Sequence, residues 1–158
     1  MADVADYPED VFERVLAVNV RGPFHVAKHA LSAMLPGGSL IFNSSVVGLT
    51  SDAGISAYAT SKHALVGLVR TAAKEVASRG IRVNSIHPGP VDNVFQHRIE
   101  TVATGEGEDR AAAIFETMIP LGRHATPEEV AHAVLYLAAD ESAMVTSHTL
   151  SIDGGMSG

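Results

Sequence analysis

Long amphipathic segments alternate with short apolar runs along this chain. Two segments are predicted helices: one from about Asp10 to Met34 with a broad apolar face, and one from Ser56 to Arg79, rich in small residues and ended by Gly80. Three apolar runs have the length of buried strands: Ser39–Ser45, Ile81–His87 and Thr149–Ile152. Because helices separate these runs, the strands should pair in parallel. The pattern predicts an α/β fold with about three strands flanked by helices.

The stretch from Val91 to Leu121 is the least regular part of the chain. It contains a polar segment, Thr104–Asp109, and a single predicted helix, Arg110–Met118. Its length and polarity favour a mobile lid over a substrate pocket rather than a part of the core. The chain therefore reads as one domain, residues 1–158, with a lid segment at about 91–121.

Two local signals refine the helices. Thr126, followed by Pro127 and by Glu129 at the third helical position, predicts a capping box and a helix to about Ala139. Pro23 interrupts the first helix and deprives the Asn19 carbonyl of its helical partner. This carbonyl is either part of a tolerated kink or aimed at a bound water, and the sequence leaves both interpretations open.

Composition narrows the class of protein. The chain has 158 residues, 46% of them apolar and 18% charged, with a net charge of -7, which suggests apolar surface that self-association would cover. The acidity and the scattered basic residues argue against nucleic-acid binding. Cysteine is absent, which excludes disulfides and fits a cytoplasmic location. No apolar stretch approaches the roughly 20 residues of a membrane span.

Tyr58 and Lys62, four residues apart in a predicted helix, are candidate catalytic residues. Residues four apart on a helix project from the same face, and a cation beside a phenol favours the ionised form of that phenol. Such a pair can donate and accept the proton of a hydroxyl/carbonyl interconversion. The spacing alone is common on helices, where it usually means a tyrosine packed on a lysine stem. Ser45, thirteen residues before Tyr58 at the end of a predicted strand, favours the chemical interpretation.

Six motifs, in order, resemble the carboxy-terminal three-fifths of a short-chain dehydrogenase/reductase. They are Asn19-Val20-Arg21-Gly22, Ser44-Ser45, Tyr58-Ala59-Thr60-Ser61-Lys62, Arg82-Val83-Asn84-Ser85-Ile86-His87-Pro88-Gly89, Thr126-Pro127-Glu128-Glu129 and Asp153-Gly154-Gly155. The resemblance implies a doubly wound, Rossmann-like parallel sheet that uses NAD or NADP, here incomplete.

The resemblance also implies roles for individual residues. Tyr58 would be the catalytic acid/base, and Lys62 would assist it and bind the nicotinamide ribose. Ser45 would hydrogen-bond the substrate oxygen, and Asn19 would hold a water linked to Lys62. Further cofactor contacts would come from Pro88, Gly89, Val91 and Asn93, the last standing where the family usually has threonine.

Several features depart from the family pattern. No glycine-rich phosphate-binding turn is present, nor the residue that selects NAD or NADP. The outer edge of the Ser39–Ser45 strand should therefore lack a partner, and we expect an isolated chain that is unstable or self-associates. Ser147 stands where glycine is common and should strain its turn.

Histidines offer weaker signals. His25 and His29 are four apart on one helix, but no third ligand has suitable spacing, so no metal site is expected. His87 is expected to be a packed residue at a strand end rather than a catalytic one.

Three functional hypotheses follow. The first is an oxidoreductase that transfers hydride between NAD(P) and a secondary alcohol or ketone, similar to 3-oxoacyl-carrier-protein reductases or sugar and polyol dehydrogenases, and inactive as this chain alone. The second is a non-catalytic association module, and the third is one half of a split enzyme. A homodimer or homotetramer would form through helices 10–34 and 56–79. The substrate and the choice between NAD and NADP remain open.

Overall fold

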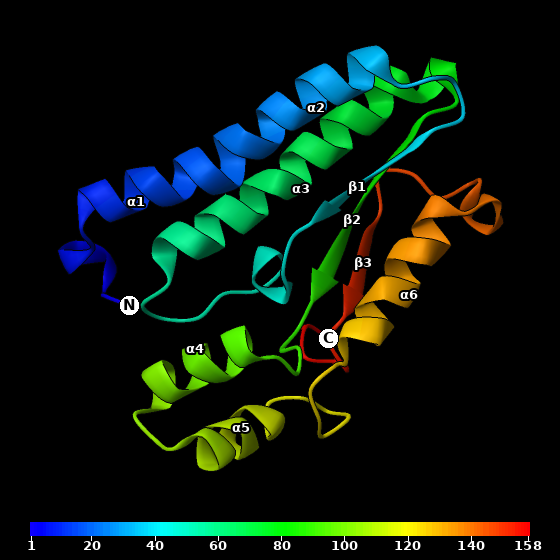
Figure 1. The fold of residues 1–158 in the computed structure, drawn as a ribbon. Helices are drawn as coiled ribbons and strands as arrows, with labels where there is room; N and C mark the ends of the chain where they lie inside the picture. The colour runs from blue at the N-terminus through cyan, green and yellow to red at the C-terminus, as the bar shows by residue number, and fades with distance from the viewer.

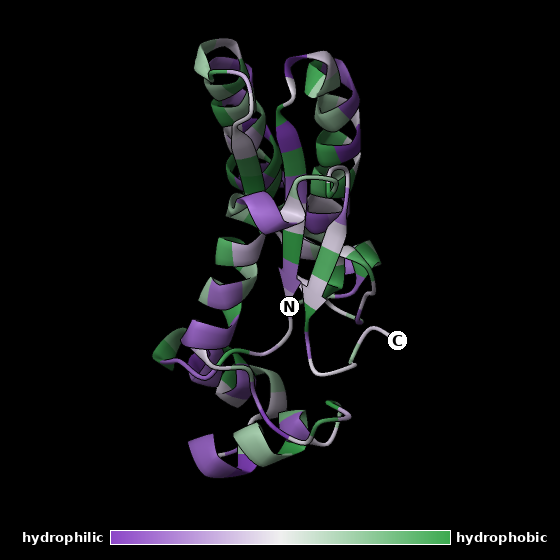
Figure 2. Ribbon diagram, turned by 90° about the vertical axis from the view of Figure 1, so that its right-hand side faces the viewer, coloured by the Kyte–Doolittle hydropathy of each residue, from purple (hydrophilic) through white to green (hydrophobic).

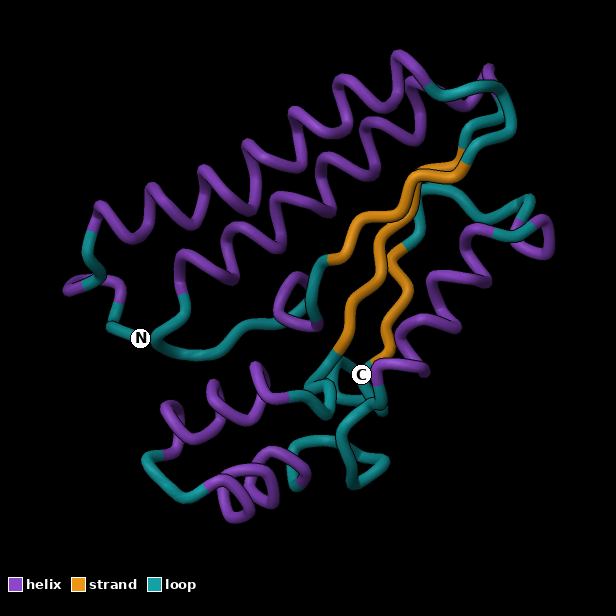
Figure 3. Tube along the Cα trace, viewed as in Figure 1, coloured by secondary structure: helices purple, strands orange, loops and turns teal.

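Three parallel strands form the centre of the molecule. The computed structural model describes residues 1–158, with strands β1 (Ser39–Asn43), β2 (Arg82–Pro88) and β3 (Thr149–Ile152) in the order β1-β2-β3 (Figures 1 and 3). Phe42 of β1 pairs with Ser85 of β2, and Ser85 also pairs with Thr149 of β3. The predicted α/β class with a three-stranded, Rossmann-like sheet is confirmed.

Helices cover both faces of this sheet. One face carries α1 (Glu9–Leu16), α2 (Gly22–Ala33) and α3 (Ser56–Val76), and the other face carries α6 (Pro127–Ala138) (Figure 1). Two further helices, α4 (Val94–Thr104) and α5 (Glu108–Glu116), lie beyond the carboxyl ends of the strands. Short helical turns complete the fold: η1 (Val4–Asp6), η2 (Ala17–Arg21), η3 (Val46–Gly48), η4 (Ala77–Arg79) and η5 (Asp140–Ser142). No helix is both long enough and apolar enough to cross a bilayer.

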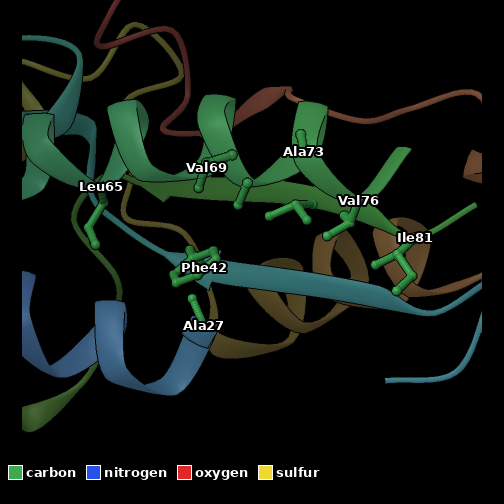
Figure 4. Packing of buried hydrophobic residues seen from close by; sticks show 9 residues of the cluster. Ala27, Phe42, Leu65, Val69, Ala73, Val76 and Ile81 are labelled. Atoms are coloured by element: carbon green, nitrogen blue, oxygen red, sulfur yellow. The ribbon is translucent and has the colours of Figure 1, made fainter. Parts of the chain in front are cut away.

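The main core lies between the sheet and α3. Phe42 of β1 projects between Ala27 of α2 and the α3 side chains around Val69 (Figure 4). In Figure 2, green apolar segments alternate with white and purple ones along the strands and the adjoining helices. Burying an aliphatic or aromatic side chain of this size stabilises a fold by about 1.5–3 kcal/mol. The small residues of α3 let this helix pack closely, and the core thereby fixes the orientation of α3.

The expected helix from about Asp10 to Met34 is confirmed, with one change of helix type. Residues Ala17–Arg21 form a π-helical turn, which the Gly22 N–H closes by bonding the Ala17 carbonyl. Pro23 then stands in the first turn of α2, where its missing N–H costs little. The sequence predicted a kink at this proline, and the structure places the irregularity in the π turn just before it.

The other helix ends follow the predicted signals. Gly80 ends the α3–η4 segment in the left-handed conformation, with φ of 66°. Thr126 and Glu129 form the capping box of α6. Ser147 is the one residue other than glycine with a positive φ, which is 62°. The sequence analysis expected strain here, because glycine is common at this position.

The expectation of an irregular 91–121 stretch is wrong, because α4 lies within it. The apolar positions of α4 (Val94, Phe95, Ile99 and Val102) are exposed, and its one buried side chain is Glu100. The usual hydrophobic pattern of a buried helix face is therefore inverted, and periodicity could not reveal the helix. The predicted Arg110–Met118 helix is shifted by two residues, to Glu108–Glu116.

The position of β1 leaves one edge of the sheet open. In the strand order β1-β2-β3, β1 pairs only with β2, so its outer edge has no strand partner, as predicted. Unpaired N–H and C=O groups on such an edge can pair with another chain.

Candidate active site

The first turns of α3 hold a tyrosine beside a lysine. The Lys62 Nζ lies 5.4 Å from the centre of the Tyr58 ring and donates a hydrogen bond of 3.3 Å to the Asn43 carbonyl at the end of β1. Burial lowers the pKa of the Lys62 ammonium, because removal from water disfavours its charge. The Tyr58 side chain remains accessible, with 38% of the residue exposed. The helix thus presents a cation and a phenol at the end of a strand.

Ser45 begins the 3₁₀ turn η3 directly after β1. Its Oγ accepts a 3.3 Å hydrogen bond from the Val47 N–H, and its carbonyl accepts one of 2.8 Å from the Gly48 N–H. Short side chains with an oxygen favour this capping position because they satisfy a free N–H of the turn. The Ser45 hydroxyl hydrogen is donated to no protein group, so it can be donated to a substrate oxygen.

The turn that carries Ser45 packs directly against α3. The Ser44 Oγ donates a hydrogen bond of 3.2 Å to the Lys62 carbonyl. A Cβ at Gly48 would lie 2.8 Å from the Ser44 Oγ and 3.0 Å from the Lys62 carbonyl oxygen, so this close approach requires glycine. These contacts place the Ser45 turn beside the same helical turn that holds Lys62.

Asn19 reaches α3 from the neighbouring helical segment. It lies in the π turn η2, and its Nδ2 donates a hydrogen bond of 3.1 Å to the Ser61 Oγ. The Ser61 Oγ in turn donates to the Tyr58 carbonyl over 2.7 Å. No hydrogen bond joins Asn19 to Lys62 directly, and the water that the sequence analysis expects between them stays a prediction. Single π turns occur frequently at functional sites.

Pro88 is the last residue of β2 and Gly89 follows it, so both lie at the carboxyl ends of the parallel strands, as Ser45 does after β1. The Gly89 N–H donates a 3.0 Å hydrogen bond to the Ile152 carbonyl of β3. A Cβ at Gly89 would lie 3.0 Å from the Cα and Cβ of Asp153, so glycine is needed where the chain passes the end of β3. The carboxyl ends of parallel strands are where open α/β sheets bind ligands.

Val91 and Asn93 continue from this strand end. Val91 forms an isolated parallel bridge with Ala125, which ties the entry to α4 to the entry to α6. The Asn93 Oδ1 caps α4 by accepting a 2.9 Å hydrogen bond from the Gln96 N–H. The carboxamide NH₂ of Asn93 is not used by this cap and keeps two donors for a ligand.

His87 connects the two halves of this region. Its fully buried imidazole lies with Nδ1 2.8 Å from the Ser45 carbonyl oxygen and Nε2 2.9 Å from the Ser85 Oγ. Burial lowers the pKa of His87, the Ser45 carbonyl opposes that effect, and the charges of Lys62 and His63 add to it. Sequence reasoning placed this residue at a strand end and missed its contact with Ser45.

The donors gathered here fit a nicotinamide ribose. The Lys62 ammonium has three N–H groups, and the hydrogen bond to the Asn43 carbonyl uses one of them, which leaves donors suited to the two hydroxyls of a ribose. Elsewhere the molecule has no group of three or more His, Cys, Asp or Glu residues arranged to hold a metal ion. The free Lys62 and Ser45 donors are therefore suited to binding hydroxyl or carbonyl oxygens.

Comparisons with known proteins agree with this chemistry. The family model described as enoyl-(acyl carrier protein) reductase matches residues 1–157. A 3-oxoacyl-(acyl-carrier-protein) reductase of Thermotoga maritima is 40% identical over 150 residues, which cover 94% of this chain and 58% of the relative. The chain thus spans about three-fifths of the length of the curated relatives that it matches.

Solved structures share the fold over nearly the whole chain. An NAD⁺-bound xylitol dehydrogenase is 33% identical with a TM-score of 0.86, covering 97% of this chain and 63% of that protein. A blue fluorescent protein from a metagenomic library, in complex with NADPH, is 29% identical with a TM-score of 0.86, covering 99% and 60%. The chain belongs to the short-chain dehydrogenase/reductase family of NAD(P)-dependent oxidoreductases.

Proposed function

We propose that this chain is the catalytic portion of an NAD(P)-dependent oxidoreductase that interconverts a ketone and a secondary alcohol. The observation that carries the proposal is the approach of the Lys62 ammonium to the Tyr58 ring at the carboxyl end of β1, where Ser45 follows. A phenol, an ammonium and an alcohol at the end of a parallel strand suit the binding and protonation of a carbonyl oxygen.

Each residue has a distinct task in this proposal. Tyr58 transfers the proton to or from the substrate oxygen, and Ser45 donates its free hydroxyl hydrogen to that same oxygen. Lys62 holds its ammonium beside the Tyr58 ring and donates to the ribose hydroxyls. The negative charge that grows on the substrate oxygen meets donors already in place, which is usually a large catalytic contribution. A bound nicotinamide supplies or accepts the hydride.

Asn19 supports the catalytic helix in this scheme. Asn19 donates a hydrogen bond to Ser61, a residue of α3 that stands between Tyr58 and Lys62 in the sequence. An ordered water beside Asn19 would connect Lys62 to solvent. Pro88, Gly89, Val91 and Asn93 line the nicotinamide side of the site in this proposal.

We infer the class of substrate from the names of two similar proteins. The similarity to a 3-oxoacyl-(acyl-carrier-protein) reductase favours a 3-oxoacyl thioester, and the similarity to a xylitol dehydrogenase favours a polyol. We place 3-oxoacyl thioesters first because that relative has the higher identity, 40% against 33%.

We further propose that residues 1–158 by themselves do not bind the dinucleotide tightly. The glycine pairs Gly37-Gly38 and Gly154-Gly155 lie in turns next to strands, and neither opens a helix, so neither forms the phosphate-binding turn of a dinucleotide site. A fluorescence titration of this chain with NADH and NADPH should show no saturable binding below the millimolar range. Tight binding would contradict this part of the proposal.

A chimera tests the catalytic proposal. The amino-terminal part of the Thermotoga maritima relative, placed before residue 1 of this chain, should supply dinucleotide binding and produce NAD(P)H oxidation with a 3-oxoacyl thioester. A Lys62→Met variant of the chimera should lose this activity. A folded chimera that binds NAD(P)H and reduces no ketone would overturn the proposal.

A further inference from the structure

We infer that His87 is a positioning residue that holds Ser45 in place through the Ser45 backbone carbonyl. This inference rests on the proposed role of Ser45 in binding the substrate oxygen. His87 lies on β2, 42 residues away from Ser45 in sequence, yet its Nδ1 lies 2.8 Å from the Ser45 carbonyl oxygen. The contact therefore joins the end of β2 to the turn that follows β1.

The carbonyl of Ser45 carries two hydrogen bonds at once. It accepts one from the Gly48 N–H, which closes η3, and one from the His87 imidazole, both at 2.8 Å. A carbonyl oxygen has two lone pairs, so both bonds can be made together. The His87 bond thus fixes the peptide plane that follows the Ser45 Cα, while the Val47 N–H, which donates to the Ser45 Oγ, positions the side-chain oxygen.

The surroundings determine which nitrogen of His87 carries the proton. A carbonyl can only accept, so Nδ1 must be the donor to Ser45. In the neutral ring Nε2 is then an acceptor for the Ser85 hydroxyl at 2.9 Å, a shorter contact than the 3.4 Å from the Ser85 Oγ to the His148 carbonyl, the other acceptor within its reach. The fully buried position of the ring and the neighbouring Lys62 ammonium on α3 favour this neutral form.

The turn is braced from its other side by α3. The Ser44 Oγ bonds the Lys62 carbonyl, and Gly48 lies against that same carbonyl. His87 supplies the contact from the sheet side. Ser45 is consequently held between β2 and α3, the two elements that carry the rest of the proposed site.

Two variants at position 87, made in the chimera described above, separate positioning from simple packing. His87→Asn keeps an amide N–H near the place of Nδ1 and can still donate to the Ser45 carbonyl, whereas His87→Leu fills the space without a donor. Hydrogen–deuterium exchange followed by mass spectrometry should show the segment 46–50 exchanging about three- to tenfold faster in His87→Leu, the loss expected for one hydrogen bond. In His87→Asn this segment should exchange as in the wild type, and α3 should be unchanged in both.

The wild-type chimera provides a second readout, which also serves if His87→Leu fails to fold. Long-range nitrogen–proton correlation spectra of the histidine rings at neutral pH should show His87 with its proton on Nδ1, the minor tautomer of free histidine. Its signals are assigned by their loss in His87→Asn. A proton on Nε2, or equal exchange of segment 46–50 in the wild type and a folded Leu variant, would overturn the inference.

The chimera described above distinguishes this inference from the proposed function. With an active chimera, His87→Leu should lower kcat at least about tenfold with a smaller change in the KM for NAD(P)H, and His87→Asn should restore most of the loss. An inactive wild-type chimera would count against the proposed function, while the exchange and tautomer results would still decide whether His87 positions the turn.

Discussion

The His124 Nε2 lies 2.7 Å from the Glu100 Oε1, and both side chains are almost entirely removed from solvent. The second ring nitrogen of His124 lies 3.4 Å from the Glu116 Oε1, so the imidazole is held between carboxylates of α4 and α5. The other Glu100 oxygen, Oε2, has no hydrogen-bond partner. A buried ion pair therefore joins the α4–α5 unit to the segment before α6.

Stability should depend on the charge of His124. Burial lowers the pKa of His124, but the hydrogen bonds and charges of Glu100 and Glu116 outweigh it, and the folded-state pKa is raised. A raised pKa gives stability that is complete below the unfolded value of about 6.5 and is lost as the pH rises through the folded value. Urea unfolding of the chimera, in which this and the following stability predictions are measured, should show the midpoint falling toward high pH between pH 6 and pH 9.

His124→Gln isolates this effect. The variant should be less stable at pH 6 by about 3 kcal/mol, the usual cost of breaking a buried pair, and its stability should change less with pH. His97, whose ring centre lies 6.0 Å from that of His124 and whose nitrogens contact Asp92 and Glu108, is left unchanged in this variant. Parallel pH profiles of the wild type and the variant would contradict the assignment.

Arg82 should be a second large contributor to stability. Its buried guanidinium donates to the Leu137 carbonyl at 2.7 Å, the Ser142 Oγ at 2.8 Å and the Ala139 carbonyl at 3.2 Å, at the end of α6. Arg82→Leu should cost about 2–4 kcal/mol, because carbonyls at a helix end lose their donors and the helix dipole loses its counter-charge. Arg82→Lys should recover part of this loss in urea unfolding, and equal stability of wild type and Arg82→Leu would rule the role out.

Ser147→Gly should stabilise the protein. Ser147 adopts φ of 62°, a left-handed conformation that costs a residue with a side chain about 1 kcal/mol. Glycine removes this cost but loses entropy, so a net gain of about 0.5 kcal/mol is expected in thermal unfolding. Ser32→Gly, within α2, is the control and should destabilise by about 0.5 kcal/mol. A lower melting temperature for Ser147→Gly would show that no strain is stored there.

The isolated chain should self-associate or unfold readily. The outer edge of β1 is unpaired, and large apolar residues of the first helical segment are exposed, among them Val18 and Val26. Size-exclusion chromatography should show a size that grows with concentration, and urea unfolding should be broad. A soluble monomer with one sharp, cooperative transition would contradict this prediction.

Local signals made much of this fold predictable. The capping box of Thr126, the left-handed Gly80 and the apolar run of β3 depend on neighbouring residues, and the structure agrees with each. Helix α4 was missed because its apolar side chains face solvent while Glu100 is buried. Charge burial of this kind depends on His124, 24 residues away, which no local pattern encodes.

In the candidate site too, contacts between neighbouring residues could be predicted from the sequence, and contacts between distant segments could not. The Tyr58–Lys62 proximity follows from helical spacing. The contact of His87 with Ser45 depends on the register of β1 against β2, and the packing of Gly48 depends on how α3 crosses the sheet. Such contacts between distant segments required the structure.

The central claim, that Tyr58 moves the proton in carbonyl reduction, is tested most directly by removing one oxygen atom. In the chimera, Tyr58→Phe should lower kcat at least about a hundredfold and leave the affinity for NAD(P)H nearly unchanged. Tyr136→Phe is the matched control, since Tyr136 on α6 is similarly exposed and lies outside the site. Loss of turnover in Tyr58→Phe alone would support the claim, and a Tyr58→Phe chimera that turns over like the wild type would contradict it.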